Sequence, residues 1–227
     1  MQPRQLPLDL KSVPALGRED FFVSGCNQFA VHWIEAWTAS WKPFPALIIY
    51  GAQGSGKTHL GEVWRKMSHA NLLTAIDFKK HSDDDILSIT HNTVIDGLEC
   101  LVGNRAEESK LFHLYNHALQ SGFYLLFLSR TSPERLNFVV DDVASRLRAC
   151  PNAEISAPDD ELLIKVLGKR FHDQGYIVAE PALIYAVTRM ERSWDAMNRL
   201  VERTIITATA EKRQITMPLL KMLVEKQ

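Results

Sequence analysis

The chain has 227 residues, of which 46% are hydrophobic and 23% are charged, and its formal net charge is −1. This length can bury a sizeable core in one large domain, or in one medium-sized domain and a small one. A net charge so near zero supplies no overall field that would draw the chain onto nucleic acid or an acidic membrane. We therefore expect no membrane partner, and we expect any contact with DNA to be local or to come through a partner protein.

The chain contains three cysteines, Cys26, Cys100 and Cys150, which lie far apart and outside any CxxC pattern. An odd number at such spacing predicts reduced thiols in a cytoplasmic protein, and argues against a disulfide framework or a zinc site. The first residues lack an apolar core of signal-peptide length, and no apolar run reaches the roughly 18 residues of a membrane span. We therefore expect neither secretion nor membrane insertion.

Near the start of the chain, four aromatic residues follow one another at every fourth position: Phe29, Trp33, Trp37 and Trp41. In an α-helix this spacing places all four rings on one face. Because large apolar side chains are usually buried, we interpret the stripe as core packing.

Residues 51–58 match the phosphate-loop pattern G-x-x-x-x-G-K-[ST] and directly follow the apolar run 46–50. In such a loop the glycines let backbone N–H groups surround the phosphates. Lys57 then reaches the β- and γ-phosphates, and the Thr58 hydroxyl binds Mg²⁺ at a helix N-terminus. The pattern thus predicts a site for a nucleoside di- or triphosphate. The expected binding residues in this segment are Gly51, Gln53, Gly54, Ser55, Gly56, Lys57, Thr58 and His59.

After the loop, short apolar runs at 72–75, 93–96, 124–129 and 153–156 alternate with helical patterns such as 60–67 and 107–120. This alternation predicts βαβ units, a mostly parallel sheet and an α/β/α sandwich, with the phosphate loop at the carboxyl end of a strand. From residue 158 onward the pattern is helical only, and Pro181 and Pro218 suit the first turns of helices. We therefore place a domain boundary near residue 157, followed by a small helical domain.

The run Val94-Ile95-Asp96 supplies a second acidic position for the nucleotide site. An Asp that ends an apolar strand orients Mg²⁺ through water in enzymes with a phosphate loop. Position 97 is a glycine where a second acid often polarises the attacking water, and Glu99 would face elsewhere if the strand continued. We predict nucleotide binding with weak hydrolysis by the chain itself.

The order of phosphate loop, Val-Ile-Asp strand, Leu-Phe-Leu-Ser strand, Ala-Ser-Arg-Leu segment at 144–147 and helical tail resembles the AAA+ ATPases of the DnaA initiator branch. The resemblance extends over about residues 18–225. It implies an AAA+ α/β/α sandwich at 18–157 with a parallel sheet, a C-terminal helical lid at 158–227, and ADP or ATP with Mg²⁺ as cofactors. It also implies that the segment 22–27, including Val23, lines the adenine pocket.

The same resemblance implies roles for two arginines. Arg146 lies in a segment, 142–147, that is similar to the family's arginine-finger box, so it would reach the γ-phosphate on a neighbouring subunit. Arg192 occupies the place of the sensor 2 arginine, which contacts nucleotide bound to the same chain. A rigid guanidinium that is always charged suits phosphate oxygens. Arg130 stands where the initiators tend to have Asp, which leaves open which residue serves as sensor 1.

The segment 5–10, Gln-Leu-Pro-Leu-Asp-Leu, resembles the peptides with which bacterial proteins bind the replicative sliding clamp. Leu8 and Leu10 would enter an apolar groove, and Gln5 would hydrogen-bond at its rim. We assign residues 1–17 to this peptide and a linker. The expected clamp-binding residues are Gln5, Leu6, Leu8 and Leu10.

DnaA carries a helix-turn-helix domain after its lid, and this sequence shows none there, so we expect no direct sequence-specific DNA binding. With a DnaA-like body of this kind, the chain resembles the Hda-type regulatory inactivators of DnaA. This implies a negative regulator of chromosomal replication initiation. It would bind the DNA polymerase III sliding clamp (beta subunit) and stimulate ATP hydrolysis on DnaA through Arg146. Two alternatives stay open: an autonomous AAA+ ATPase or loader acting on replication factors, and a non-catalytic adaptor that recruits DnaA-like proteins. Whether the chain forms a homo-oligomer is also open.

Overall fold

The protein is described by a computed structural model that covers residues 22–225, so the predicted clamp-binding residues at 5–10 lie outside the described part. Its centre is a sheet of five parallel strands in the order β2-β3-β4-β1-β5. This arrangement confirms the predicted parallel α/β architecture. The strands are β1 (Ala46–Gly51), β2 (Asn71–Thr74), β3 (Thr93–Asp96), β4 (Leu125–Ser129) and β5 (Asn152–Ile155).

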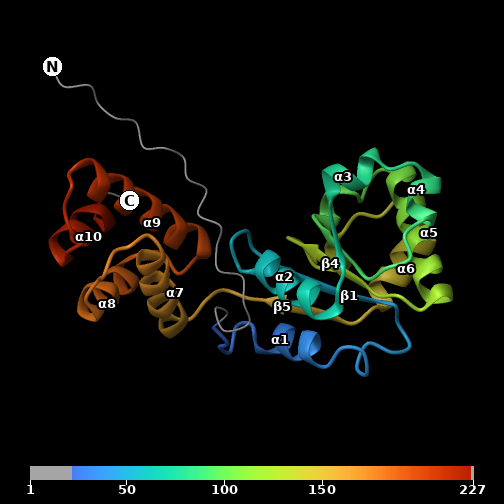
Figure 1. Ribbon diagram of the computed structural model, residues 1–227, viewed down its shortest axis with the longest axis horizontal. Helices are drawn as coiled ribbons and strands as arrows, with labels where there is room; N and C mark the ends of the chain where they lie inside the picture. The colour runs from blue at the N-terminus through green and yellow to red at the C-terminus, as the bar shows by residue number, and fades with distance from the viewer. Residues whose placement is uncertain (1–21, 226–227) are drawn as a thin grey trace, which may run out of the picture.

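Helices cover both faces of this sheet (Figure 1). Successive strand residues point to opposite faces, so Leu47 and Ile49 pack with one layer while Ala46 and Ile48 pack with the other. The first layer holds α1 (Gln28–Glu35) and α2 (Lys57–Ser68). The second layer holds α3 (Ala75–Lys80), α4 (Asp83–Leu87), α5 (Arg105–Ser121) and α6 (Asp141–Ala149).

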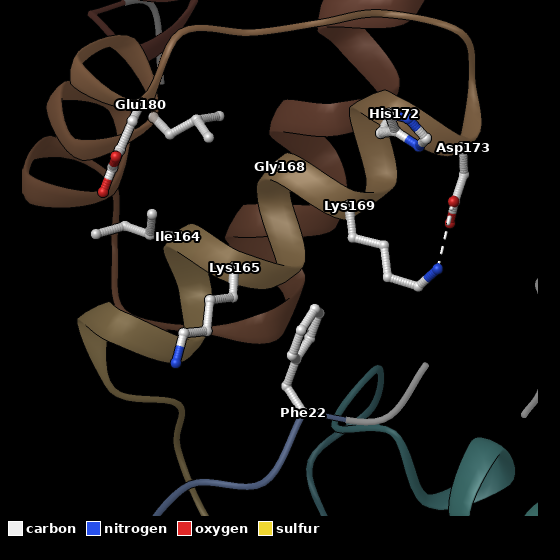
Figure 2. A pocket seen from close by; sticks show the side chains of 9 residues that line it. Phe22, Ile164, Lys165, Gly168, Lys169, His172, Asp173 and Glu180 are labelled. Atoms are coloured by element: carbon white, nitrogen blue, oxygen red, sulfur yellow. Dashed lines mark hydrogen bonds and ion pairs between the residues drawn. The ribbon is translucent and has the colours of Figure 1, made fainter. Parts of the chain in front are cut away.

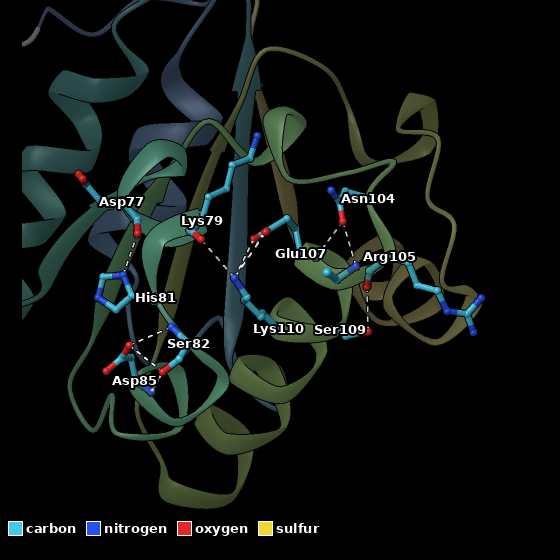
Figure 3. A network of polar contacts seen from close by, with 11 residues as sticks. Asp77, Lys79, His81, Ser82, Asp85, Asn104, Arg105, Glu107, Ser109 and Lys110 are labelled. Carbon is cyan, nitrogen blue, oxygen red and sulfur yellow. Dashed lines mark hydrogen bonds and ion pairs between the residues drawn. The ribbon is translucent and has the colours of Figure 1, made fainter.

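The short helices of the second layer are held by local polar contacts (Figure 3). Ser82 and Asp85 form a capping box at the start of α4, and the Asn104 side chain caps α5. Lys110 of α5 donates to the backbone carbonyl of Lys79 at 3.3 Å. This last hydrogen bond joins α3 to α5.

The aromatic stripe near the start of the chain does not lie on one helical face, so that prediction was wrong. Helix α1 ends at Glu35, before Trp37 and Trp41, and the spacing therefore no longer determines where these rings point. Phe29 is 67% exposed, whereas Trp41 is fully buried and stacks on Trp64 with ring centroids 5.2 Å apart. Core packing holds for Trp41, and Trp33 and Trp37 pack against the same core while partly buried, but Phe29 is exposed.

The helical part of the chain has a hydrophobic core of its own, separate from the two cores that flank the sheet. Figure 1 places its helices together at one end of the molecule. The predicted boundary near residue 157 falls in the segment between β5 and the first of these helices. We call this part the lid; it consists of α7 (Asp160–Asp173), α8 (Glu180–Arg189), α9 (Trp194–Ala210) and α10 (Met217–Val224).

Two shorter 3-10 helices lie near the carboxyl ends of the strands. The first, η2 (Leu98–Cys100), follows β3, and the second, η3 (Pro133–Arg135), follows β4. Over residues 22–225, no helix combines the length and the apolar character that crossing a membrane requires.

Candidate nucleotide-binding site

The phosphate loop connects the end of β1 to the start of α2, as the sequence pattern requires. Gly54 and Gly56 have φ angles of +76° and +94°, which side chains rarely adopt, so both positions favour glycine. A Cβ atom at Gly51 would collide with the backbone carbonyl of Ile155 on β5. The loop is therefore a tight backbone cradle directly before a helix N-terminus, which is a favourable place for phosphate groups.

Lys57 is buried and its ammonium group donates to the carbonyl oxygens of Gly51 and Ala52, both at 2.7 Å. Burial lowers the pKa of Lys57, while the negative charges of Glu99 and Asp96 act in the opposite direction. The lysine is thus folded back over its own loop. A bound phosphate would offer the ammonium group an anionic acceptor in place of these carbonyls.

The predicted magnesium residues meet at the edge where β3 ends and α2 begins. Thr58 Oγ1 donates to Asp96 Oδ2 at 2.9 Å. Among residues 22–225, no group of three or more histidine, cysteine or carboxylate side chains could hold a metal ion. Mg²⁺ in nucleotide sites takes few protein ligands and is completed by phosphates and water, so one hydroxyl and one carboxylate fit this ion.

Glu99 also belongs to this site. It would face elsewhere if the strand continued, but β3 ends at Asp96, Gly97 has φ +96°, and the chain turns into η2. The Glu99 side chain is only 19% exposed and lies 3.4 Å from Arg130 Nε, and its Oε2 accepts the Arg130 backbone N–H at 3.1 Å. Of the charges near Lys57, Glu99 acts on its pKa more strongly than Asp96.

The lid reaches the phosphate loop through α9, a contact that sequence reasoning missed. A Cβ at Gly54 would come within 2.5 Å of Asn198 Nδ2 and 3.4 Å of Trp194 Cβ. Within the described residues, Ser55 Oγ, Trp194 Nε1 and Asn198 Oδ1 are buried and lack a hydrogen-bond partner. Buried polar atoms are rarely left unpaired, so the junction of the loop and α9 carries polar groups that the described residues do not satisfy.

Arg192, the predicted sensor 2 residue, lies just before α9 and points to another helix. Its guanidinium is 69% exposed and forms a 2.7 Å ion pair with Asp160 at the start of α7. The structure therefore does not bring it onto the phosphate loop.

The remaining predicted cofactor residues surround the loop at greater exposure. Val23 is 47% exposed, Gln53 is exposed at the tip of the loop, and His59 lies in the first turn of α2. Val23 belongs to the segment 22–27, which is attached to the end of β5 because the Ser156 backbone N–H donates to the Cys26 carbonyl at 3.0 Å.

Arg146, the predicted arginine finger, lies on α6. Its guanidinium carbon lies 4.7 Å from the ring centroid of Phe112 and 5.8 Å from that of Tyr115, both on α5. It is thus placed against a neighbouring helix rather than on the phosphate loop of its own chain.

A cavity of about 460 Å³ lies elsewhere, on the lid surface between α7 and α8. Figure 2 shows the ring of Phe22 directed at α7 below Lys169, which pairs with Asp173 at 3.3 Å. No phosphate-loop residue lines this cavity, so it is not the nucleotide site.

No family model matches the chain. An uncharacterised protein of Haemophilus influenzae is 26% identical over 226 residues, which cover 96% of this chain and 97% of that protein. The chromosomal replication initiator protein DnaA of Flavobacterium psychrophilum is 25% identical over 201 residues, or 81% of this chain and 42% of DnaA. The chain spans about half the length of the DnaA proteins it matches.

Among solved structures, domain III of DnaA from Thermotoga maritima superposes with a TM-score of 0.80 at 19% identity, covering 94% of this chain and 97% of that domain. DnaA from Aquifex aeolicus, solved with bound AMPPCP, has a TM-score of 0.68 at 20% identity and covers 86% of this chain and 65% of that one. The fold is therefore the predicted AAA+ fold, and the chain is similar to the AAA+ domain of DnaA.

Proposed function

We propose that this chain is an adenine-nucleotide-bound, clamp-associated regulator that stimulates ATP hydrolysis on DnaA and so limits initiation of chromosome replication in the cytoplasm. Arg146 acts as the arginine finger in this scheme. It lies beside the γ-phosphate of ATP bound to DnaA and stabilises the negative charge of the transition state. An arginine supplied by a partner accelerates hydrolysis by about 10³ to 10⁵ in well-studied GTPases.

The observation that carries this proposal is that the Arg146 guanidinium has no counter-ion within the described residues. The side chain is half-buried, yet within residues 22–225 it has no ion pair and its Nε has no hydrogen-bond partner. Partial burial of a cation without a counter-ion is unfavourable, because no ion pair within the chain offsets the lost hydration. An anion on a partner molecule would supply that ion pair.

The resident ligand in the proposal is ADP or ATP with Mg²⁺, held by Lys57, Thr58 and Asp96. The tight loop, the unpartnered Ser55 Oγ and the similarity to AMPPCP-bound DnaA support this assignment. Arg192 would contact the phosphates only after leaving Asp160. Because exposed ion pairs contribute about 0–1 kcal/mol, this exchange would cost little.

The proposed partners are DnaA and the sliding clamp. The similarity of this chain to DnaA supports the first. Support for the clamp rests on the segment 5–10 alone, with Leu8 and Leu10 as its anchors.

The test is the rate at which ATP prebound to DnaA becomes ADP in the presence of DNA-loaded clamp and this chain. We expect acceleration by the unmodified protein, and loss of it in Arg146→Ala and in Leu8→Ala/Leu10→Ala. Arg189→Ala is a matched control, because Arg189 also lies over an aromatic ring, 4.0 Å from the centroid of Tyr185, but on the lid. No acceleration by the unmodified protein would reject the proposal, and full acceleration by Arg146→Ala would indicate an adaptor.

One observation favours a second candidate, an autonomous ATPase. Glu99 supplies an acidic side chain at the phosphate site that Gly97 does not. This candidate predicts turnover of ATP by the isolated chain and its loss in Glu99→Gln.

A further inference from the structure

The side chain of Arg146 is stacked on a surface that α5 provides. Its guanidinium carbon lies 4.7 Å from the centroid of the Phe112 ring and 5.8 Å from that of Tyr115. Both distances lie within the roughly 6 Å over which an aromatic face attracts a cation. The two rings therefore contact a group that carries a full charge and has no anionic partner within residues 22–225.

Arg148, two positions after Arg146 on the same helix, provides a contrast. Its guanidinium donates to the backbone carbonyl of Leu136 at 3.2 Å and lies near that of Pro133 at 3.5 Å. Through these contacts Arg148 holds the segment at 133–136 against α6. In contrast, the Nε of Arg146 is buried and has no hydrogen-bond partner within the described residues.

Part of the aromatic surface, the ring of Tyr115, is fixed by a contact with Cys150 at the C-terminal end of α6. Tyr115 is buried, and its hydroxyl lies 3.8 Å from the thiol of Cys150, which also donates to the Arg146 carbonyl at 3.2 Å. Cys150 thereby ties the end of α6 to α5. The ring of Tyr115 and the backbone that carries Arg146 are thus positioned by the same buried thiol.

We propose that Phe112, backed by Tyr115, is a positioning residue that holds the Arg146 guanidinium flat and presents its Nη groups to an anion on a partner. This inference rests on the proposed function, in which the anion is the phosphate of nucleotide bound to DnaA. The aromatic face supplies attraction without neutralising the charge, so the arginine is oriented before the partner arrives. Orientation in advance reduces the rotamer entropy lost on binding.

The first test compares Phe112→Leu with Phe112→Tyr in the stimulated hydrolysis assay. A cation over an aromatic ring at an exposed site contributes about 0.5–1 kcal/mol, so we expect Phe112→Leu to lower the stimulated rate about two- to fivefold. Phe112→Tyr, which keeps the ring face, should retain the rate. Tyr185→Leu removes the ring beneath Arg189 and serves as the matched control that leaves the rate unchanged.

Binding of nucleotide by the chain itself separates positioning from a loss of folding. Phe112 lies outside the phosphate loop, so Phe112→Leu should keep the affinity of the unmodified chain for Mg²⁺-ADP while it lowers the stimulated rate. A comparable loss of ADP affinity in Phe112→Leu, or a drop in the stimulated rate in Phe112→Tyr as large as in Phe112→Leu, would overturn the inference.

A second readout does not depend on DnaA. A ring beneath a guanidinium shifts the NMR resonance of the arginine Nε–H, so this resonance of Arg146 should move in Phe112→Leu and stay in Tyr185→Leu. If the resonance behaves in this way but the unmodified chain fails to stimulate DnaA, the proposed function fails while the stacking stands. If Phe112→Leu leaves the resonance unchanged, the positioning role is rejected.

Discussion

Thr58 Oγ1 donates a 2.9 Å hydrogen bond to Asp96 Oδ2, which joins the first turn of α2 to the end of β3. The two groups come from segments with a whole strand and two short helices between them, so their meeting is a property of the parallel sheet. Each is a suitable ligand, direct or through water, for Mg²⁺ on a nucleotide.

We expect Thr58→Ala to lower the affinity for Mg²⁺-ADP about tenfold, because one contact to a charged group contributes about 1.5 kcal/mol or more. Thr58→Ser keeps the hydroxyl and should bind like the unmodified chain. Calorimetric titrations with Mg²⁺ and with EDTA check this. Equal affinities of the two variants in Mg²⁺ would contradict the assignment of Thr58 as a ligand.

Glu99 is expected to disfavour the additional negative charge of a γ-phosphate, since its carboxylate lies among Lys57, Asp96 and Arg130. Replacing it with Gln should raise the affinity for ATP relative to ADP by roughly fivefold, corresponding to about 1 kcal/mol of electrostatic repulsion. Competition titrations measure this ratio. Glu161→Gln removes an exposed lid carboxylate and is the control; an unchanged ratio in Glu99→Gln would exclude the role.

Arg192 is held by Asp160 at 2.7 Å, and this pair gives a test of its proposed contact with phosphate. Asp160→Asn frees the guanidinium and should strengthen nucleotide binding about two- to fivefold, the value of an exposed ion pair. The gain should vanish in Arg192→Ala. If Asp160→Asn gives the same gain in that background, Arg192 does not contact the nucleotide.

Glu108 is fully buried on α5 and accepts the backbone N–H groups of Gly103, Val139 and Val140 at 2.7–3.0 Å. Removing the carboxylate leaves these donors without their acceptor, so Glu108→Ala should lower the free energy of unfolding by about 3 kcal/mol or more. Urea denaturation measures it. As a control, Glu161→Ala at the exposed pair with Lys165 should change the free energy by about 0.5 kcal/mol at most. A Glu108→Ala protein as stable as the unmodified chain would contradict this account.

Burial raises the pKa of the Cys150 thiol to about 12 from an ordinary value of 9.0. Between these pH values the unfolded chain loses this proton while the folded chain keeps it, so the unfolded state is favoured as pH rises. The free energy of unfolding should fall through this window by up to about 1.4 kcal/mol per pH unit. Burial also raises the pKa of Tyr115, which adds to the decline.

Cys150→Ala should therefore show a shallower decline, measured by urea denaturation at pH values below and within this window. Cys100→Ala removes an exposed thiol and is the matched control. A slope that is unchanged in Cys150→Ala would show that this thiol does not titrate as burial requires.

Several features of this protein were determined by the sequence alone, because the relevant residues are adjacent along the chain. The glycines, lysine and threonine of the phosphate loop at 51–58 stand at a characteristic spacing, and Asp96 ends an apolar strand. Period-two and helical patterns then distinguish strands from helices, since they report which side of an element is buried. From these signals the parallel sandwich and the lid could be predicted.

Only the tertiary structure decided which distant side chains converge. The turn at Gly97 brings Glu99 beside Lys57, and the docking of α9 brings Asn198 against Gly54. Likewise, packing of α5 on α6 places Phe112 under Arg146. Periodicity reports burial but not the relative placement of elements, which depends on how separate cores pack and where helices end. For this reason the loop was found from the sequence, whereas the groups that surround it and the support of Arg146 were not.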